Sequence, residues 1–244
     1  MKIVIIIPTY NEAASIEQTV LSLEKVISGI LEHQISILIY DSHSEDSTLE
    51  IVKKLQNQFD NIVIETEAQK SGLGNAYVQA MRYAIENLQA ELVFEFDADG
   101  SHQPKFIVSM IAAIEQGADV AVGSRYVKGG EIQVGWPWYR RLISQGGNGI
   151  ARLFLTSRYK DFTSGFRATK STFLKPVLDQ GLLSKNYAYK IHLLWALHQL
   201  GANIVEVPIV FVDREEGYSK FPKNNMSESF KVVLILWLRK LWRR

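Results

Sequence analysis

The segment Leu92-Val93-Phe94-Glu95-Phe96-Asp97-Ala98-Asp99 is a mostly apolar run that ends in two carboxylates. The run has the length and composition of a buried β-strand, so the carboxylates stand where the strand passes into a loop. Two aspartates at such an exit can share one divalent cation, and hard cations such as Mg²⁺ keep further positions for phosphate oxygens. The triplet alone is weak evidence, because Asp-x-Asp also occurs as an Asx-turn or in a solvated loop.

Strands and helices are predicted to alternate on both sides of this segment. Apolar runs of strand length and stretches with helical apolar spacing follow one another up to residue 123. Repeated strand–helix units predict an α/β fold with a mostly parallel central sheet flanked by helices. The predicted strands are residues 2–7, 35–40, 61–66, 91–96 and 118–123, and the predicted helices are residues 12–31, 47–59, 74–88 and a further helix after Pro104-Lys105.

Polar clusters follow three of the predicted strands. They are Pro8-Thr9-Tyr10-Asn11-Glu12, Asp41-Ser42-His43-Ser44 and Asp97-Ala98-Asp99. In such a sheet, ligands bind beyond the carboxyl ends of the strands, so we expect all three clusters at one edge. The Gly- and Trp-rich stretch 128–138 departs from the alternation and is predicted to be an active-site loop.

Composition sets further limits. The chain has 244 residues, of which 47% are hydrophobic and 22% charged, and this is typical of a globular domain. No repeat or linker indicates a boundary, so residues 1–222 are expected to form one domain, followed by a C-terminal helix over residues 223–244. The net charge of +1 argues against a nucleic-acid partner, and the absence of cysteine excludes disulfides and thiolate metal sites.

A dinucleotide-binding fold is the first alternative. The loop after the first strand has no glycine that would let the backbone approach a pyrophosphate. Gly72-Leu73-Gly74 lacks the third glycine of that motif, and a tight turn before a helix explains it at least as well. Phosphate charge must then be met by a metal ion and by side chains, which leads back to Asp97 and Asp99.

Several motifs, taken in order and spacing, resemble the inverting family-two glycosyltransferases with a GT-A fold. Two later segments are similar to the dolichyl-phosphate (polyprenyl-phosphate) mannose synthase group, and the resemblance covers about residues 1–222. The first set is Pro8-Thr9-Tyr10-Asn11-Glu12, Asp41-Ser42-x-Ser44-x-Asp46, Gly72-Leu73-Gly74-Asn75-Ala76, Asp97-Ala98-Asp99-x-Ser101-His102 and Gly123-Ser124-Arg125-Tyr126; the later two are Trp136-Pro137-x-Tyr139-Arg140-Arg141-Leu142-Ile143-Ser144 and Asp161-x-Thr163-Ser164-Gly165-Phe166-Arg167.

The resemblance implies a GT-A-type nucleotide-sugar-binding fold and a set of donor-binding residues. Glu12 also suits the first turn of a helix, where the macrodipole favours a carboxylate. Ser42 stands where relatives often have a second carboxylate, which leaves the preferred nucleobase open. The implied donor site consists of Pro8, Tyr10, Glu12, Tyr40, Asp41, Ser42, Asp97, Ala98, Asp99, Arg214 and Lys220, the last two on a loop that closes over the diphosphate.

The resemblance also implies a metal site and an acceptor site. Asp97, Asp99 and Ser101 are the implied metal ligands, and an all-oxygen set suits Mg²⁺ or Mn²⁺. Arg125, Arg140 and Ser144 match the acceptor-phosphate site. Arginine binds phosphate through paired, charge-assisted hydrogen bonds, although a lone arginine more commonly forms a surface salt bridge. The implied catalytic residues are Asp99, Arg125, Arg140 and Ser144.

The implied reaction is inverting transfer of a sugar, first of all mannose from GDP-mannose, to a polyprenyl or dolichyl monophosphate. A phosphate monoester is already ionised near neutral pH, with a second pKa of about 6, so its oxygen needs no general base. A saccharide hydroxyl as acceptor would need one. The alternatives are transfer of glucose or an N-acetylhexosamine from a UDP-sugar to polyprenyl phosphate or to a saccharide, and a catalytically silent nucleotide-sugar binder.

The C-terminal stretch 227–244 combines an apolar run with aromatic and basic residues. The run 232–238 is shorter than the roughly 20 residues that cross a bilayer. We therefore predict a basic amphipathic helix at the cytoplasmic face of a membrane, which would make the protein peripheral. The alternative is a terminal helix packed on the domain or on another subunit, and a protein partner or a homo-oligomer is left open.

Overall fold

The computed structural model describes residues 1–132, 138–212 and 225–242, with only the backbone described for residues 138–140 and 225. The described strands are β1 (Lys2–Thr9), β2 (Gln34–Asp41), β3 (Ile62–Thr66), β4 (Leu92–Glu95), β5 (Val120–Ser124), β6 (Glu131–Ile132), β7 (Arg167–Lys170), β8 (Ile204–Pro208) and β9 (Val210–Phe211). The described helices are α1 (Ile16–Ile27), α2 (Thr48–Gln56), α3 (Leu73–Glu86), α4 (Phe106–Glu115), α5 (Trp138–Phe154), α6 (Ser171–Gln180), α7 (Tyr189–Gln199) and α8 (Asn225–Trp242).

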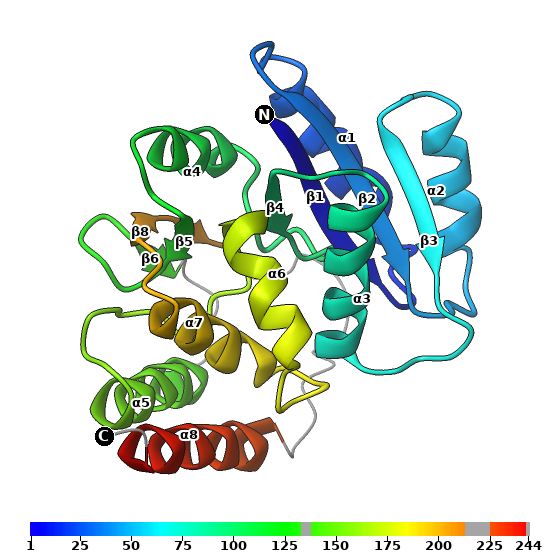
Figure 1. Ribbon diagram of the computed structural model, residues 1–244. Helices are drawn as coiled ribbons and strands as arrows, with labels where there is room; N and C mark the ends of the chain where they lie inside the picture. The colour runs from blue at the N-terminus through cyan, green and yellow to red at the C-terminus, as the bar shows by residue number, and fades with distance from the viewer. Residues whose placement is uncertain (133–137, 213–224, 243–244) are drawn as a thin grey trace.

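The central sheet has the strand order β3-β2-β1-β4-β7-β5-β8 (Figure 1). Its neighbouring strands pair in parallel except at β7, which runs antiparallel to both β4 and β5. A short parallel pair, β6 with β9, forms beside it. The predicted α/β fold with a mostly parallel sheet is confirmed, and the strands after β5, among them the antiparallel β7, are ones that the alternation along the sequence did not predict.

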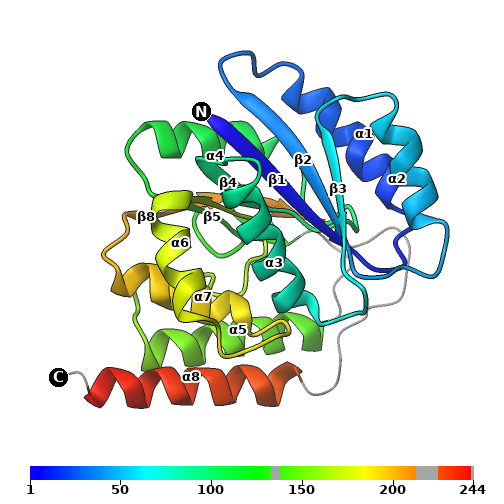
Figure 2. The same cartoon turned by 45° about the vertical axis from the view of Figure 1, so that its right-hand side comes forward.

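Helices cover both faces of the sheet (Figure 2). The core on one side includes residues of α3, α6 and α7, and the core on the other includes residues of α1, α2 and α4. In β1, Val4 and Ile6 face the first side, whereas Ile3, Ile5 and Ile7 face the second. An unbroken apolar run such as Ile3 to Ile7 is what a strand buried on both faces requires.

The first helix begins later than predicted. α1 starts at Ile16 rather than at residue 12, because the intervening loop makes hydrogen bonds to the loop after β2 instead of continuing the helix. Asn11 has a positive φ of 54°, its side-chain oxygen accepts the amide of Glu45, and its own amide donates to the Ser44 hydroxyl. The short polar side chain of asparagine tolerates this left-handed conformation.

The stretch predicted as an active-site loop is only partly described. Within residues 128–138, Glu131–Ile132 forms strand β6, residues 133–137 lie outside the described part, and Trp138 already opens helix α5. The prediction of a loop is therefore wrong for Glu131–Ile132, which form a strand, and for Trp138, which begins a helix.

Helix α8 packs on α5 and α7, so the terminal helix lies against the domain (Figure 1). Val232, Val233 and Leu236 are its buried side chains. The Lys240 ammonium donates a hydrogen bond of 2.6 Å to the carbonyl of Leu155, just beyond the end of α5, where a cation complements the helix dipole. Within the described residues, none of the helices combines the length and the hydropathy that a membrane crossing needs.

His192 on α7 lines a cavity of about 150 Å³ between α6, α7 and α8. Burial, reinforced by the nearby Arg239 charge on α8, lowers the pKa of His192 to about 4. Lys240 lines the same cavity. The unfolded chain therefore takes up a proton between pH 6.5 and 4 that the folded chain does not, so the free energy of unfolding falls across this window as the pH drops.

We expect His192→Gln to reduce the fall in the free energy of unfolding as the pH drops. Urea denaturation of the wild type and the variant at pH 7.5 and 5.0 measures it, and the difference in unfolding free energy between the two pH values should be smaller in the variant. The same substitution at exposed His43 is the control. Equal pH dependence in the wild type and His192→Gln would contradict this account of the α7–α8 packing.

Candidate active site

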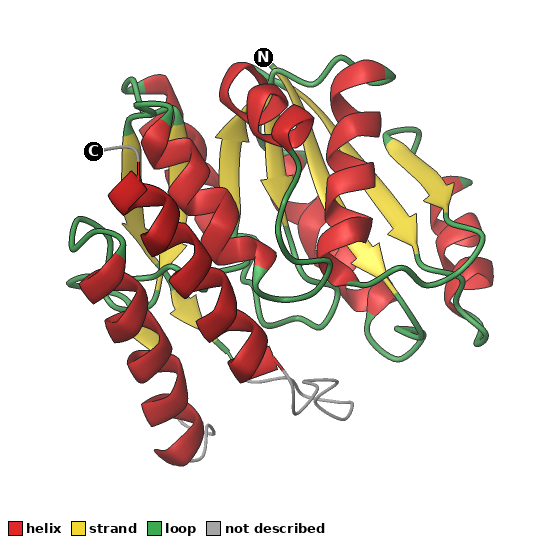
Figure 3. Cartoon of the chain, turned by 60° about the horizontal axis from the view of Figure 1, so that its bottom comes forward, coloured by secondary structure: helices red, strands yellow, loops and turns green. Residues whose placement is uncertain are grey.

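The carboxyl ends of β1, β2, β4 and β5 lie at one edge of the sheet, as the sequence predicted. Strand β7 runs in the opposite direction, so its beginning lies at this same edge: Arg167 pairs with Glu95 of β4 and with Val122 of β5. Figure 3 shows the strand arrows and the loops at their ends. The segment 161–166, which precedes β7, is thereby placed between the loops that follow β4 and β5.

The loops after β1 and β2 are joined through Asp41. Its carboxylate is fully buried and accepts hydrogen bonds from the Thr9 hydroxyl at 2.8 Å and from the Ser44 amide at 2.8 Å. The amide of Glu12 in turn donates to the Thr48 hydroxyl at 2.9 Å. Asp41 therefore fixes the shape of the predicted nucleoside pocket from beneath, while Glu12 lies half-buried in the turn before α1.

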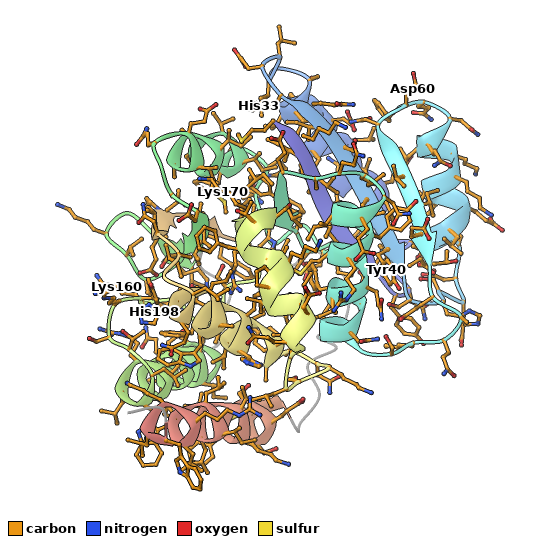
Figure 4. The ribbon with its side chains drawn as sticks, in the orientation of Figure 1. His33, Tyr40, Asp60, Lys160, Lys170 and His198 are labelled. Carbon is orange, nitrogen blue, oxygen red and sulfur yellow. The ribbon has the colours of Figure 1, made fainter. Side chains whose placement is uncertain are left out.

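The other predicted nucleoside residues lie around these two loops. Tyr40 is buried and packs in the core on the α3 side of the sheet, and Figure 4 labels it at the end of β2. Ser42 is also buried, whereas Pro8 and Tyr10 are half-buried. The Lys70 ammonium, from the loop after β3, lies 3.3 Å from the centre of the Tyr10 ring, so a cation that the sequence analysis did not single out joins this pocket.

The Gly72-Leu73-Gly74 turn serves close packing. A Cβ atom on Gly72 would lie 2.6 Å from the carbonyl oxygen of Lys185, and one on Gly74 would lie 2.7 Å from that of Asn186. The Gly74 amide donates to Lys185 at 2.8 Å, so an amide at the start of α3 is already satisfied by protein. The turn before a helix was the correct interpretation.

Asp97 is half-buried and held by two rings. The Tyr77 hydroxyl donates to Oδ1 at 3.1 Å, and burial raises the pKa of Tyr77 well above its usual value, so the donor stays protonated. His102 Nδ1 accepts the Asp97 amide at 3.0 Å, which leaves the ring proton on Nε2, 3.5 Å from Asp97 Oδ2. Burial lowers the pKa of His102, which keeps this ring neutral.

Asp99 and Ser101 complete the predicted metal site. The Ser101 amide donates to Asp99 Oδ1 at 3.0 Å, and Ser101 itself is buried. Among the described residues, histidines, aspartates and glutamates do not gather in threes that could hold a metal ion. Two carboxylates from one short loop fit Mg²⁺ or Mn²⁺, because such a cation takes its remaining ligands from substrate phosphates and water. Direct ligation by Ser101 stays a prediction.

Arg125, just beyond β5, forms a buried pair with Asp161. Nε and Nη2 of Arg125 donate to the two carboxylate oxygens at 2.7 Å each, and Nη2 also donates to the Thr163 hydroxyl at 2.8 Å. Burial alone would raise the pKa of Asp161, but the charge and hydrogen bonds of Arg125 hold it below its usual value. Nη1 makes no hydrogen bond within the described part of the chain.

Ser144 on α5 lies beside this pair. Its hydroxyl accepts the Tyr126 hydroxyl at 2.8 Å, and its carbonyl accepts the side-chain amide of Asn148 at 3.0 Å. Asn148 also donates to the Thr163 hydroxyl at 3.2 Å and accepts the Phe162 amide at 2.7 Å. The structure thus brings Arg125 and Ser144 into one cluster, and Asn148 ties α5 to the segment before β7.

The same segment joins the cluster of Arg125 and Ser144 to the carboxylate pair. The carbonyl of Thr163 accepts the Tyr187 hydroxyl at 2.9 Å. A Cβ atom on Gly165 would lie 3.2 Å from Asp97 Oδ2 and 2.2 Å from the ammonium of Lys190, which is 3.9 Å from the same oxygen. The sequence analysis assigned no role to Lys190, because it stands in an apolar helical stretch far from any quoted motif.

Three predicted residues cannot be placed in the site. Arg140 belongs to α5, but its side chain lies outside the described part, and Arg214 and Lys220 fall within residues 213–224, which are likewise outside it. Their roles stay predictions.

Comparison with known proteins identifies the family of this chain. The model of the glycosyl transferase family 2 matches residues 4–178. The chain belongs to glycosyl transferase family 2. It is 36% identical over 234 residues to the polyprenol monophosphomannose synthase of Mycolicibacterium smegmatis, covering 94% of this chain and 84% of that protein. It is 34% identical over 242 residues to the undecaprenyl-phosphate mannosyltransferase of Micrococcus luteus, covering 99% and 96%. The resemblance to the polyprenyl-phosphate mannose synthase group is confirmed.

The fold of this glycosyltransferase agrees with a solved structure. Glucosyl-3-phosphoglycerate synthase from Mycobacterium tuberculosis, solved with Mn²⁺, UDP and glucosyl-3-phosphoglycerate, has a TM-score of 0.67 at 18% identity, covering 97% of this chain and 79% of that one. At this level of identity the likeness concerns the fold, and it confirms the GT-A architecture.

We expect Asp161→Asn to destabilise this glycosyltransferase by about 3–5 kcal/mol, because it leaves the Arg125 guanidinium buried without its charge partner. Asp161 is 0% exposed, so solvent cannot replace the lost carboxylate. Urea denaturation at pH 7 measures the change in unfolding free energy.

The control is Asp119→Asn at the opposite edge of the sheet, where Figure 4 labels Lys170. Asp119 lies 3.1 Å from Lys170, but their side chains are 20% and 32% exposed, so this pair should contribute no more than about 1 kcal/mol. If the free energy of unfolding fell equally in both variants, the buried pair of Asp161 with Arg125 would not be a special anchor of this segment.

Proposed function

We propose that this glycosyltransferase transfers mannose from GDP-mannose to a polyprenyl monophosphate, with inversion at the anomeric carbon. The observation that carries the proposal is the segment 161–165, which holds Arg125 at one end and lies against Asp97 at the other. A site for an anionic nucleophile therefore adjoins a carboxylate pair suited to a metal-bound diphosphate. The activities for which the two relatives above are named favour a polyprenyl phosphate acceptor and mannose as the sugar.

The charges of the site residues suggest which ligand each of them binds. Arg125 and Ser144, with Arg140 from the same helix as Ser144, hold the acceptor phosphate. Its oxygen is already ionised near neutral pH and attacks the anomeric carbon without a general base. Asp97 and Asp99 would hold a divalent cation, whose positive charge would stabilise the departing diphosphate.

The remaining donor contacts follow the same division. The loops after β1 and β2 hold the nucleoside, with Tyr10, Glu12 and Ser42 lining the pocket above the buried Asp41. Arg214 and Lys220 close over the diphosphate and stabilise its developing charge. In-line attack then turns an α-linked donor into a β-linked lipid phosphate sugar.

Radiolabel transfer from GDP-mannose to a short polyprenyl phosphate tests the proposal. With Mg²⁺ or Mn²⁺ we expect labelled lipid, no label in EDTA, and loss of at least about a hundredfold in rate for Asp99→Ala, because the cation stabilises the leaving group by several kcal/mol. Asp60→Ala, a carboxylate in the turn before β3, is the matched control and should keep full activity.

Parallel reactions with UDP-glucose and UDP-N-acetylglucosamine decide the donor. Label from a UDP-sugar alone would keep the acceptor and replace GDP-mannose. Full activity of Asp99→Ala under metal-depleted conditions would refute the metal-dependent mechanism.

The acceptor lipid also requires a membrane surface, and α5 and α8 supply a suitable face. Besides its buried apolar residues, α8 has a second set of apolar residues that are exposed and spaced four residues apart. Its members and those on α5 are Met226, Phe230, Leu234, Leu238 and Trp242 with Leu142, Ile143, Ile150 and Leu153. Exposed cations accompany them at Arg152, Lys231 and Arg239, each worth about 1 kcal/mol against an anionic surface. We therefore place this face on the bilayer, with the protein peripheral at the cytoplasmic side.

We expect Leu153→Glu and Trp242→Glu each to weaken binding to vesicles containing anionic lipid by about tenfold, the effect of losing one buried apolar side chain. Leu153 and Trp242 are 79% and 90% exposed, so neither change should reduce stability. Co-sedimentation measures the partition, and Leu31→Glu, at a residue that is 86% exposed between α1 and β2, is the control. Equal losses in all three variants would refute this docking face.

A further inference from the structure

Lys190 is a buried cation beside the carboxylate pair. It is the second residue of α7, and its side chain is 3% exposed. Nζ lies 3.9 Å from Asp97 Oδ2 and 4.6 Å from the centre of the Tyr187 ring. Burial and the dipole at a helix N-terminus both oppose a positive charge at this place. The negative charge of the site therefore compensates a cation that the helix itself disfavours.

The surrounding backbone holds Lys190 in this position. Arg167, which is fully buried, donates from Nη2 to the carbonyls of Ser164 at 3.2 Å and of Lys190 at 3.3 Å. Gly165, between these two contacts, leaves the space that the ammonium occupies, since a Cβ atom there would lie 2.2 Å from Nζ. The segment before β7 and the start of α7 are thus built around this cation.

We propose that Lys190 is an internal cation of the metal centre, which weakens the binding of a free divalent cation at Asp97 and Asp99 and strengthens the binding of the donor diphosphate. The inference rests on the proposed function, because it requires the divalent cation and the donor diphosphate to bind together at Asp97 and Asp99. With Lys190 present, the two carboxylates and the ammonium carry one negative charge rather than two. Once a divalent cation is bound, the centre carries a net positive charge rather than none, and this attracts a diphosphate.

The two effects have opposite signs, and this separates them from a structural role. Loss of the ammonium should tighten Mn²⁺ binding and loosen nucleoside diphosphate binding, whereas a change that merely disturbs the site loosens both. Lys190 acts through Asp97, so it is a positioning residue for the metal centre and not a reacting group.

The experiment compares Lys190→Gln with the wild type by isothermal titration calorimetry. We expect Mn²⁺, added without nucleotide, to bind about tenfold more tightly to the variant, from the loss of one neighbouring charge. GDP and UDP, each titrated at saturating Mn²⁺, should bind several-fold more weakly to the variant than to the wild type. Thermal melting and circular dichroism establish that the variant is folded.

A second variant and a matched control accompany it. Lys190→Met, which removes the charge but keeps most of the length of the side chain, should shift Mn²⁺ affinity in the same direction as Lys190→Gln. Lys185→Gln removes the same charge from an exposed position in the preceding loop and should change neither affinity.

The outcomes distinguish the inference from the function on which it rests. Tighter Mn²⁺ binding with weaker nucleotide binding in the folded variants supports it. Unchanged or weaker Mn²⁺ binding in both variants overturns it, while the wild type's own Mn²⁺ and nucleotide binding leaves the proposed function standing. A wild type that binds no Mn²⁺, even with GDP or UDP present, overturns the metal-dependent function and this inference together.

Discussion

The reversal of β7 is the constraint on which the active site depends. Because β7 runs antiparallel between β4 and β5, the chain that enters it approaches from the carboxyl edge of its two neighbours. Asp161 thereby reaches Arg125 at the end of β5, and Gly165 reaches Asp97 at the end of β4. A parallel strand in the same place would deliver its preceding loop to the other edge. Arg125 and the carboxylate pair would then have no shared segment to hold them at a fixed separation.

Charge is buried beneath this edge as well as on it. Glu95 and Arg167 face each other across β4 and β7 with 3.7 Å between Oε2 and Nε, and the Tyr189 hydroxyl donates to Glu95 at 2.7 Å. Burial raises the pKa of Glu95, an effect that Arg167 and Tyr189 partly offset. Tyr189 stacks on Tyr77, which donates to Asp97. Such a network costs desolvation energy, and Glu95 Oε2 and Arg167 Nε and Nη1 are buried in it without a hydrogen-bond partner in the described part of the chain. Through it the core of the sheet orients the carboxylate on which the metal site depends.

Helix α5 connects the proposed acceptor site to the apolar face. Ser144 on its inner side contacts Tyr126 beside Arg125, while Leu153 near its end is exposed next to α8. The hydrogen bond from Lys240 to the carbonyl of Leu155 holds the ends of the two helices together. A lipid acceptor needs its phosphate in the site and its chain in a bilayer. One helix that carries a phosphate-site residue on one side and apolar side chains on the other satisfies both requirements over a short distance.

The alternation of strands and helices follows from the amino-acid sequence, because apolar periodicity depends only on neighbouring residues, and this alternation predicts that the clusters around Tyr10, Asp41 and Asp97 lie at one edge. Matching motifs also identified the family. Local patterns could not show that β7 is antiparallel, because the residue pattern of a four-residue strand is the same whichever way the strand runs in the sheet. They could not pair Arg125 with Asp161, 36 residues away, or place Lys190 at the metal centre from inside an apolar helix. Those contacts arise when distant segments pack against each other, so they become visible in the folded chain alone.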